Sequence, residues 1–97
     1  MKYSKETIVE KNITLSFEFE RFILENPAVL EQIPDGAEVV LLPKDDLELY
    51  RINLQASRKR VSETPIVYIE IEALAPPRSR LINPRMTRHP TGARPLA

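Results

Sequence analysis

The first 25 residues combine two hydrophobic periods. In LSFEFERFILEN, residues 15–26, apolar and polar residues alternate as in a half-buried strand, yet apolar residues also recur every three or four positions. On a helical wheel the apolar side chains of residues 8–25 form two arcs, and the charged side chains gather on the remaining side only at helical period. The pattern therefore predicts a helix over Ser4–Glu25, with Ser4 as its N-cap.

This predicted helix carries two apolar stripes, whereas an ordinary surface helix carries one. A chain of 97 residues has little material with which to cover both. The helix is thus expected to be sandwiched inside the fold or shared with a second subunit, and the second stripe supplies the candidate interface residues Ile13, Phe17 and Leu24. The first stripe consists of Ile8, Leu15, Phe19, Phe22 and Ile23, and the second of Val9, Ile13, Phe17 and Leu24.

Proline and glycine divide the next segment into a short helix and a turn. Asn26 suits the cap of a new helix and Pro27 its first position, so a helix is expected up to Ile33. Pro34 stops that helix, and the Pro-Asp-Gly sequence that begins there is typical of a turn.

The middle of the chain reads as strand, helix, strand. Residues 38–42 (EVVLL) lack alternation, which is typical of a strand buried on both faces. Asp45 with Glu48 resembles a capping box for a helix over 46–60, and residues 66–74 (IVYIEIEAL) alternate as a strand with one wet face or at an edge of the sheet. A βαβ unit implies parallel strands. The expected fold class is therefore α/β, in the order α-α-β-α-β, with two layers and a small parallel sheet packed on the N-terminal helix. Because a two-stranded sheet is weak alone, the sheet is a second reason to expect a homodimer, formed either by joining sheet edges or by packing the first helices.

Charge divides the chain unevenly. Residues 1–74 hold nine Lys and Arg against fourteen Asp and Glu, for a net −5, whereas residues 75–97 hold five Arg and no acid. Such a basic segment either binds nucleic acid or lies on an acidic surface, its own or a partner's. We expect one domain over residues 1–84 and a Pro/Arg-rich tail over 85–97, with Leu81 and Ile82 as anchors of the proline-rich segment's first half.

Candidate chemistry is confined to the carboxyl ends of the two strands, where ligands of open α/β sheets usually bind. Asp45 and Asp46 follow the first strand, and Arg78 and Arg80 follow the second. One interpretation is a binding site for a small ligand or metal. The other is structural: a helix cap, an acid at the positive helix end and an ion pair. With no cysteine, one histidine (His89) and two glycines, the sequence predicts no catalytic residue, no metal site and no cofactor.

Two passages, LSFEFERFILENPAVLEQIPDGAEVVLLPKDD and PIVYIEIEALAPPRSRLINP, resemble a family of small prokaryotic proteins of unknown function. The resemblance extends over residues 12–84 and brings no catalytic residues with it. It implies that PPRSR belongs to the domain and that the segment after Pro84 is an extension.

Together these patterns favour a cytoplasmic, non-catalytic interaction or regulatory protein that forms a homodimer or binds a protein partner. The basic tail would serve as its contact arm, and no membrane segment is expected. The alternative is a small-ligand or metal-dependent hydrolase that uses Asp45, Asp46, Arg78 and Arg80.

Overall fold

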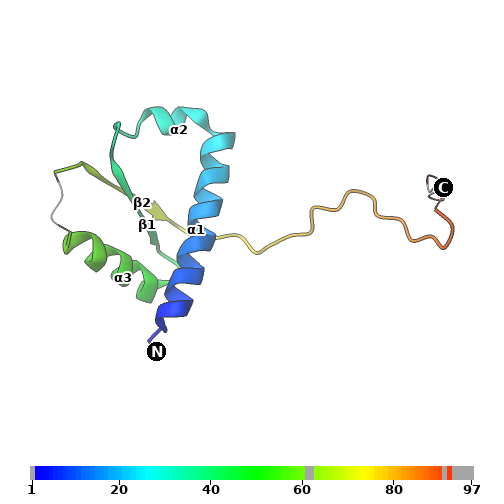
Figure 1. Cartoon of the computed structure of the whole chain (residues 1–97), viewed down its shortest axis with the longest axis horizontal. Coiled ribbons are helices and arrows are strands. Elements are labelled where there is room, and N and C mark those ends of the chain that lie inside the picture. The colour runs from blue at the N-terminus through cyan, green and yellow to red at the C-terminus, as the bar shows by residue number, and fades with distance from the viewer. Residues whose placement is uncertain (1, 61–62, 91, 93–97) are drawn as a thin grey trace, which may run out of the picture.

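A computed structural model describes residues 2–60, 63–90 and 92 of the chain. Two helices precede a parallel two-stranded sheet whose strands are joined through a third helix (Figure 1). The predicted element order and the mixed α/β class are confirmed. The elements are α1 (Lys5–Glu25), α2 (Pro27–Glu31), β1 (Glu38–Pro43), α3 (Leu47–Arg58) and β2 (Ile66–Ile71).

Helix α1 begins and ends with side-chain hydrogen bonds. The Ser4 hydroxyl accepts a hydrogen bond from the Thr7 amide at 3.1 Å, as predicted for its N-cap. At the other end, the side-chain amide of Asn26 donates to the Phe22 carbonyl at 2.9 Å. Asn26 is the N-cap residue of α2, as predicted, but its side chain forms no capping hydrogen bond there and closes α1 instead.

The two strands lie in register from Glu38 opposite Ile66 to Pro43 opposite Ile71. Strand β2 ends three residues before the predicted position, Leu74, although the alternation of the sequence continues. The chain bends at Glu72, and the Leu74 amide donates to the Asp45 carboxylate at 3.3 Å rather than to a strand.

The two faces of the sheet are covered by different helices. Helix α3 covers one face, where the Tyr50 hydroxyl donates to the Glu70 carboxylate at 2.8 Å. Helix α1 lies against the other face, where Phe19 and Ile69 line the same hollow. The hydrophobic core is small: among the described residues, the buried apolar side chains are Leu15, Val40, Leu42 and Leu49.

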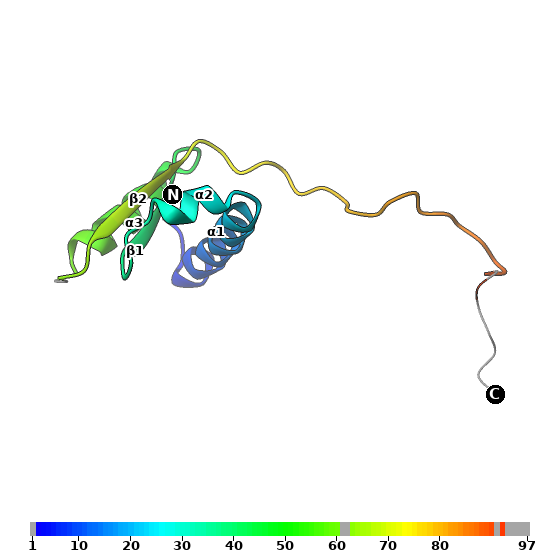
Figure 2. The same cartoon turned by 90° about the horizontal axis from the view of Figure 1, so that it is seen from above.

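Beyond β2 the chain runs away from the body as an extended segment that continues in the direction of the strand (Figures 1 and 2). Leu81 and Ile82 are 74% and 89% exposed. The expectation that they anchor this segment to the domain of the same chain is therefore wrong. Asn83 adopts a φ of 46° in the left-handed region, which asparagine tolerates better than most residues, and it is followed by Pro84.

Candidate interaction surface

Asp46 is the most heavily bonded carboxylate of the described chain. It accepts hydrogen bonds from the Leu49 amide at 3.2 Å, from the Tyr3 hydroxyl at 3.0 Å and from the Lys11 ammonium group at 3.2 Å. The Lys11 ammonium group also lies 4.8 Å from the centre of the Tyr3 ring. Asp46 thus caps α3 and ties the N-terminus of that helix to the start of α1.

These contacts shift the pKa values of all three side chains. Burial by itself would raise the pKa of Asp46, but the hydrogen bonds from Leu49, Lys11 and Tyr3 outweigh it and lower the pKa. The hydrogen bond to Asp46 raises the pKa of Tyr3 and likewise raises that of Lys11. Asp46 is therefore ionised and fully engaged at neutral pH, which is the arrangement of a structural link.

The structure does not bring the four predicted site residues together. The prediction that Asp45 begins the capping box is wrong, because its neighbour Asp46 occupies the cap and Asp45 binds the Leu74 amide. Arg78 and Arg80 lie in the extended segment, and within the described ranges neither forms an ion pair with these carboxylates. The described residues also contain no group of three or more His, Cys, Asp or Glu side chains that could hold a metal ion.

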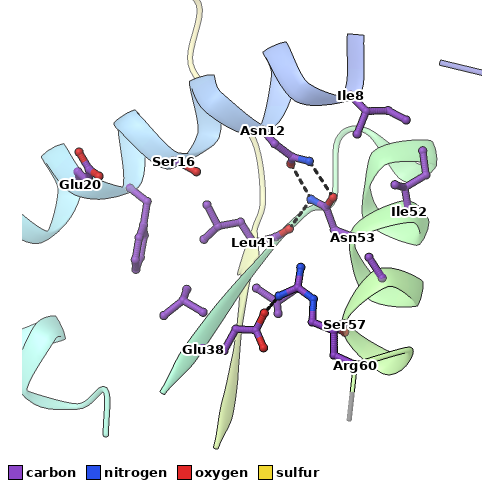
Figure 3. A pocket seen from close by; sticks show the side chains of 14 residues that line it. Ile8, Asn12, Ser16, Glu20, Glu38, Leu41, Ile52, Asn53, Ser57 and Arg60 are labelled. Carbon is purple, nitrogen blue, oxygen red and sulfur yellow. Dashed lines mark hydrogen bonds and ion pairs between the residues drawn. The ribbon is translucent and has the colours of Figure 1, made fainter. Parts of the chain in front are cut away.

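A second polar link lies in a groove of about 520 Å³ between α1, β1 and α3 (Figure 3). Asn12 and Asn53 exchange two side-chain hydrogen bonds of 3.1 Å and 2.9 Å, and Asn53 also donates to the Leu41 carbonyl at 2.9 Å. The other end of the groove is closed by an ion pair between Glu38 and Arg60. Sequence reasoning missed this link, although the helical wheel places Asn12 among the inward apolar positions of α1.

The second apolar stripe of α1 faces away from the sheet. Ile13, Phe17 and Leu24 are 49%, 59% and 80% exposed, and Val9 on the same stripe is also exposed. Leu15, on the first stripe, is buried. The body of this chain therefore covers only part of the first stripe, from which Phe22 is 49% exposed, and leaves the predicted interface residues in contact with solvent.

Neither the fold nor the residues at the strand ends indicate a class of enzyme. The structure is that of a small α/β protein with an exposed helix face and an extended basic segment. The chain belongs to the family of unknown function DUF5647, whose model matches residues 7–84. The resemblance to such a family, read from the sequence, is confirmed. No curated protein and no solved structure matched the chain. Among the described helices, none is long and apolar enough to cross a bilayer.

Proposed function

We propose that this protein is a non-catalytic interaction protein that works as a homodimer, with the outward stripe of α1 as one of its contact surfaces. The observation that carries the proposal is the exposure of Ile13, Phe17 and Leu24 on one face of a 21-residue helix. Contiguous apolar surface on a small protein marks an interaction site far more often than scattered single residues do.

The outward stripe of α1 is too small to hold a stable dimer by itself. The stripe from Val9 to Leu24 is roughly 22 Å long at 1.5 Å per residue. At a width of about 10 Å it offers roughly 200–300 Å² per subunit, compared with about 800 Å² per partner in a stable interface. The α1 contact by itself therefore gives weak association, and a stable dimer requires a further contact.

The fate of the strand-end carboxylates supports the non-catalytic interpretation. Asp46 accepts hydrogen bonds from Tyr3, Lys11 and Leu49, which favours a structural role over one as an acid, a base or a metal ligand. Asp45 is exposed, and its carboxylate accepts a hydrogen bond from the Leu74 amide.

The test compares Phe17→Glu with Thr14→Glu by sedimentation velocity at micromolar protein concentrations. Both changes add one carboxylate to an exposed position of α1, but only Phe17 lies on the apolar stripe. We expect a dimeric wild type, an unchanged Thr14→Glu variant, and for Phe17→Glu a dissociation constant raised at least about tenfold by burial of the new charge. A wild type that stays monomeric would refute the homodimer, and equal behaviour of the two variants would remove α1 from the interface.

A further inference from the structure

The outer edge of β2, on the side away from β1, is open. The Glu38 amide donates to the Pro65 carbonyl at 2.8 Å, and the Lys44 amide donates to the Ile71 carbonyl at 2.7 Å. Backbone groups alternate along a parallel pair, so residues 65, 67, 69 and 71 face β1. Residues 66, 68 and 70 consequently point their backbone groups outward, and in the described part of the chain no other strand pairs with them. Such an edge is a template for an added strand.

The two faces beside this edge differ in chemistry. On the α3 face lies the carboxylate of Glu70, and Glu72 follows one residue beyond the end of β2, where the chain bends. On the α1 face lies an apolar hollow of about 340 Å³. A strand that fits this edge therefore needs basic side chains on one side and an apolar side chain on the other. The hollow is lined mainly by Leu15, Phe19, Phe22, Ile69, Ile71 and Leu74.

The segment Arg78-Ser79-Arg80-Leu81-Ile82, called the arm below, has this alternation. In extended conformation its two arginines point to one side and Leu81 points to the other. All five residues of the arm are exposed, although Leu81 and Ile82 are large and apolar. It ends at Asn83, whose left-handed backbone turns the chain, and at Pro84, which lacks a donor for strand pairing.

The link between β2 and the arm directs the arm away from its own edge. Pro76 and Pro77 have φ fixed near −65°, and the residue before each proline is held in an extended conformation. Ala75 and Pro76 therefore resist the reversal that a hairpin with the chain's own β2 would need. In the structure this link is extended and continues outward (Figures 1 and 2).

We infer that the arm of one copy pairs antiparallel with the outer edge of β2 in a second copy, and that the second copy returns the same contact. This inference rests on the proposed self-association and supplies the further contact that α1 needs. In a symmetric exchange of this kind the two-fold axis passes between the two chains at the same residue of each copy. Residues equally far before and after that residue in the two copies then lie opposite each other. With the axis at Ala75, the pairs are Glu70 with Arg80, Glu72 with Arg78, Tyr68 with Ile82, and Ile69 with Leu81.

In this register the side chains on both faces of the arm lie opposite groups of matching chemistry. Both arginines lie opposite carboxylates, and Glu70 also keeps its contacts with Tyr50 and with Lys44 at 3.8 Å. Leu81 lies over the apolar hollow. Shifting the arm by one residue would instead turn both arginines toward that hollow.

The decisive experiment reverses the charges on each side separately. One variant carries Glu70→Arg and Glu72→Arg, and the other carries Arg78→Glu and Arg80→Glu. Each variant alone opposes like charges in both contacts, so we expect its dissociation constant to rise at least about 100-fold. An equimolar mixture of the two restores opposite charges in both contacts, and sedimentation should then show a heterodimer. Reversal of Arg85 and Arg88, which lie beyond the paired segment, gives the matched control and should leave association unchanged.

A second pair of variants tests the apolar side of the arm. Leu81→Asn should weaken association, whereas Met86→Asn, which changes an equally exposed residue outside the arm, should not. Neither residue contacts its own body, so a failure to fold does not confuse this comparison. Circular dichroism of the β2 variants checks that loss of the Tyr50–Glu70 hydrogen bond leaves the fold intact.

The outcomes separate the two proposals. If the wild type dimerises and Phe17→Glu weakens the dimer, but the arm variants do not, the arm inference is overturned and the homodimer stands. If both charge variants associate more weakly and their mixture does not restore association, the arm pairs with its own chain instead. That result would also overturn the inference. A monomeric wild type overturns the homodimer and the exchange together.

Discussion

Replacing Asp46 with alanine removes the carboxylate that joins the starts of α1 and α3. The variant loses the N-cap of α3, worth about 1 kcal/mol, and the ion pair with the partly exposed Lys11, worth about 0.5 kcal/mol. We therefore expect the free energy of unfolding to fall by about 1.5 kcal/mol, roughly a tenfold change in the unfolding equilibrium.

Urea denaturation followed by circular dichroism measures this loss. With a slope of about 1 kcal/mol per molar urea for a protein of this size, the midpoint should move down by about 1.5 M. Asp45→Ala is the matched control, because it removes the same group from the adjacent, exposed position and breaks a single 3.3 Å contact. Its cost should stay within about 0.5 kcal/mol. Equal losses in the two variants would refute the assignment of Asp46 as the structural carboxylate.

The same residue gives the wild type a defined pH dependence. Because the folded pKa of Asp46 lies below that of the unfolded chain, its contribution is complete above about pH 4 and is lost as the pH falls through the folded pKa. The difference in stability between wild type and Asp46→Asn should therefore be largest at neutral pH and shrink in acid. A difference that stays constant from pH 7 to about pH 2 would contradict the lowered pKa.

Two further predictions concern packing and the groove. Leu49→Ala, at a side chain only 2% exposed, should cost about 2–5 kcal/mol in urea unfolding, and a loss below about 1 kcal/mol would contradict its central place in the core. Asn53→Ala should lower the free energy of unfolding by about 1–2 kcal/mol, because it leaves the Asn12 amide and the Leu41 carbonyl without their hydrogen-bond partner. Gln55→Ala, at an exposed position of the same helix, should change that free energy by less than about 0.5 kcal/mol.

The order of elements followed from local signals: helical periodicity in α1 and α3, alternation in β2, an unbroken apolar run in β1, and the Asn-Pro sequence before α2. The boundary of α3 did not, since Asp45 and Asp46 are equivalent as caps in sequence and the choice depends on Tyr3 and Lys11, more than 30 residues away. The early end of β2 likewise depends on a long-range contact, between Leu74 and Asp45. Local periodicity contains no information about such contacts.

The candidate surfaces were predictable to different degrees. Two apolar stripes on one helix are visible in sequence, and so is the split of charge between body and tail. The open edge of β2 was also predictable, because both strands of a two-stranded sheet are edge strands. The exposure of Leu81 was not predictable, because an apolar residue type alone does not decide whether a side chain is buried.

The distance along the chain between α1 and its partners has a consequence for biosynthesis. Roughly 46 residues separate the end of α1 from the end of β2, which lies beneath it. At a translation rate of about 5–20 residues per second, about 2 to 9 s pass between the completion of the helix and the arrival of the surface that shelters its inner stripe. During that interval the nascent helix exposes apolar side chains on two sides, which makes the unfinished chain prone to aggregation.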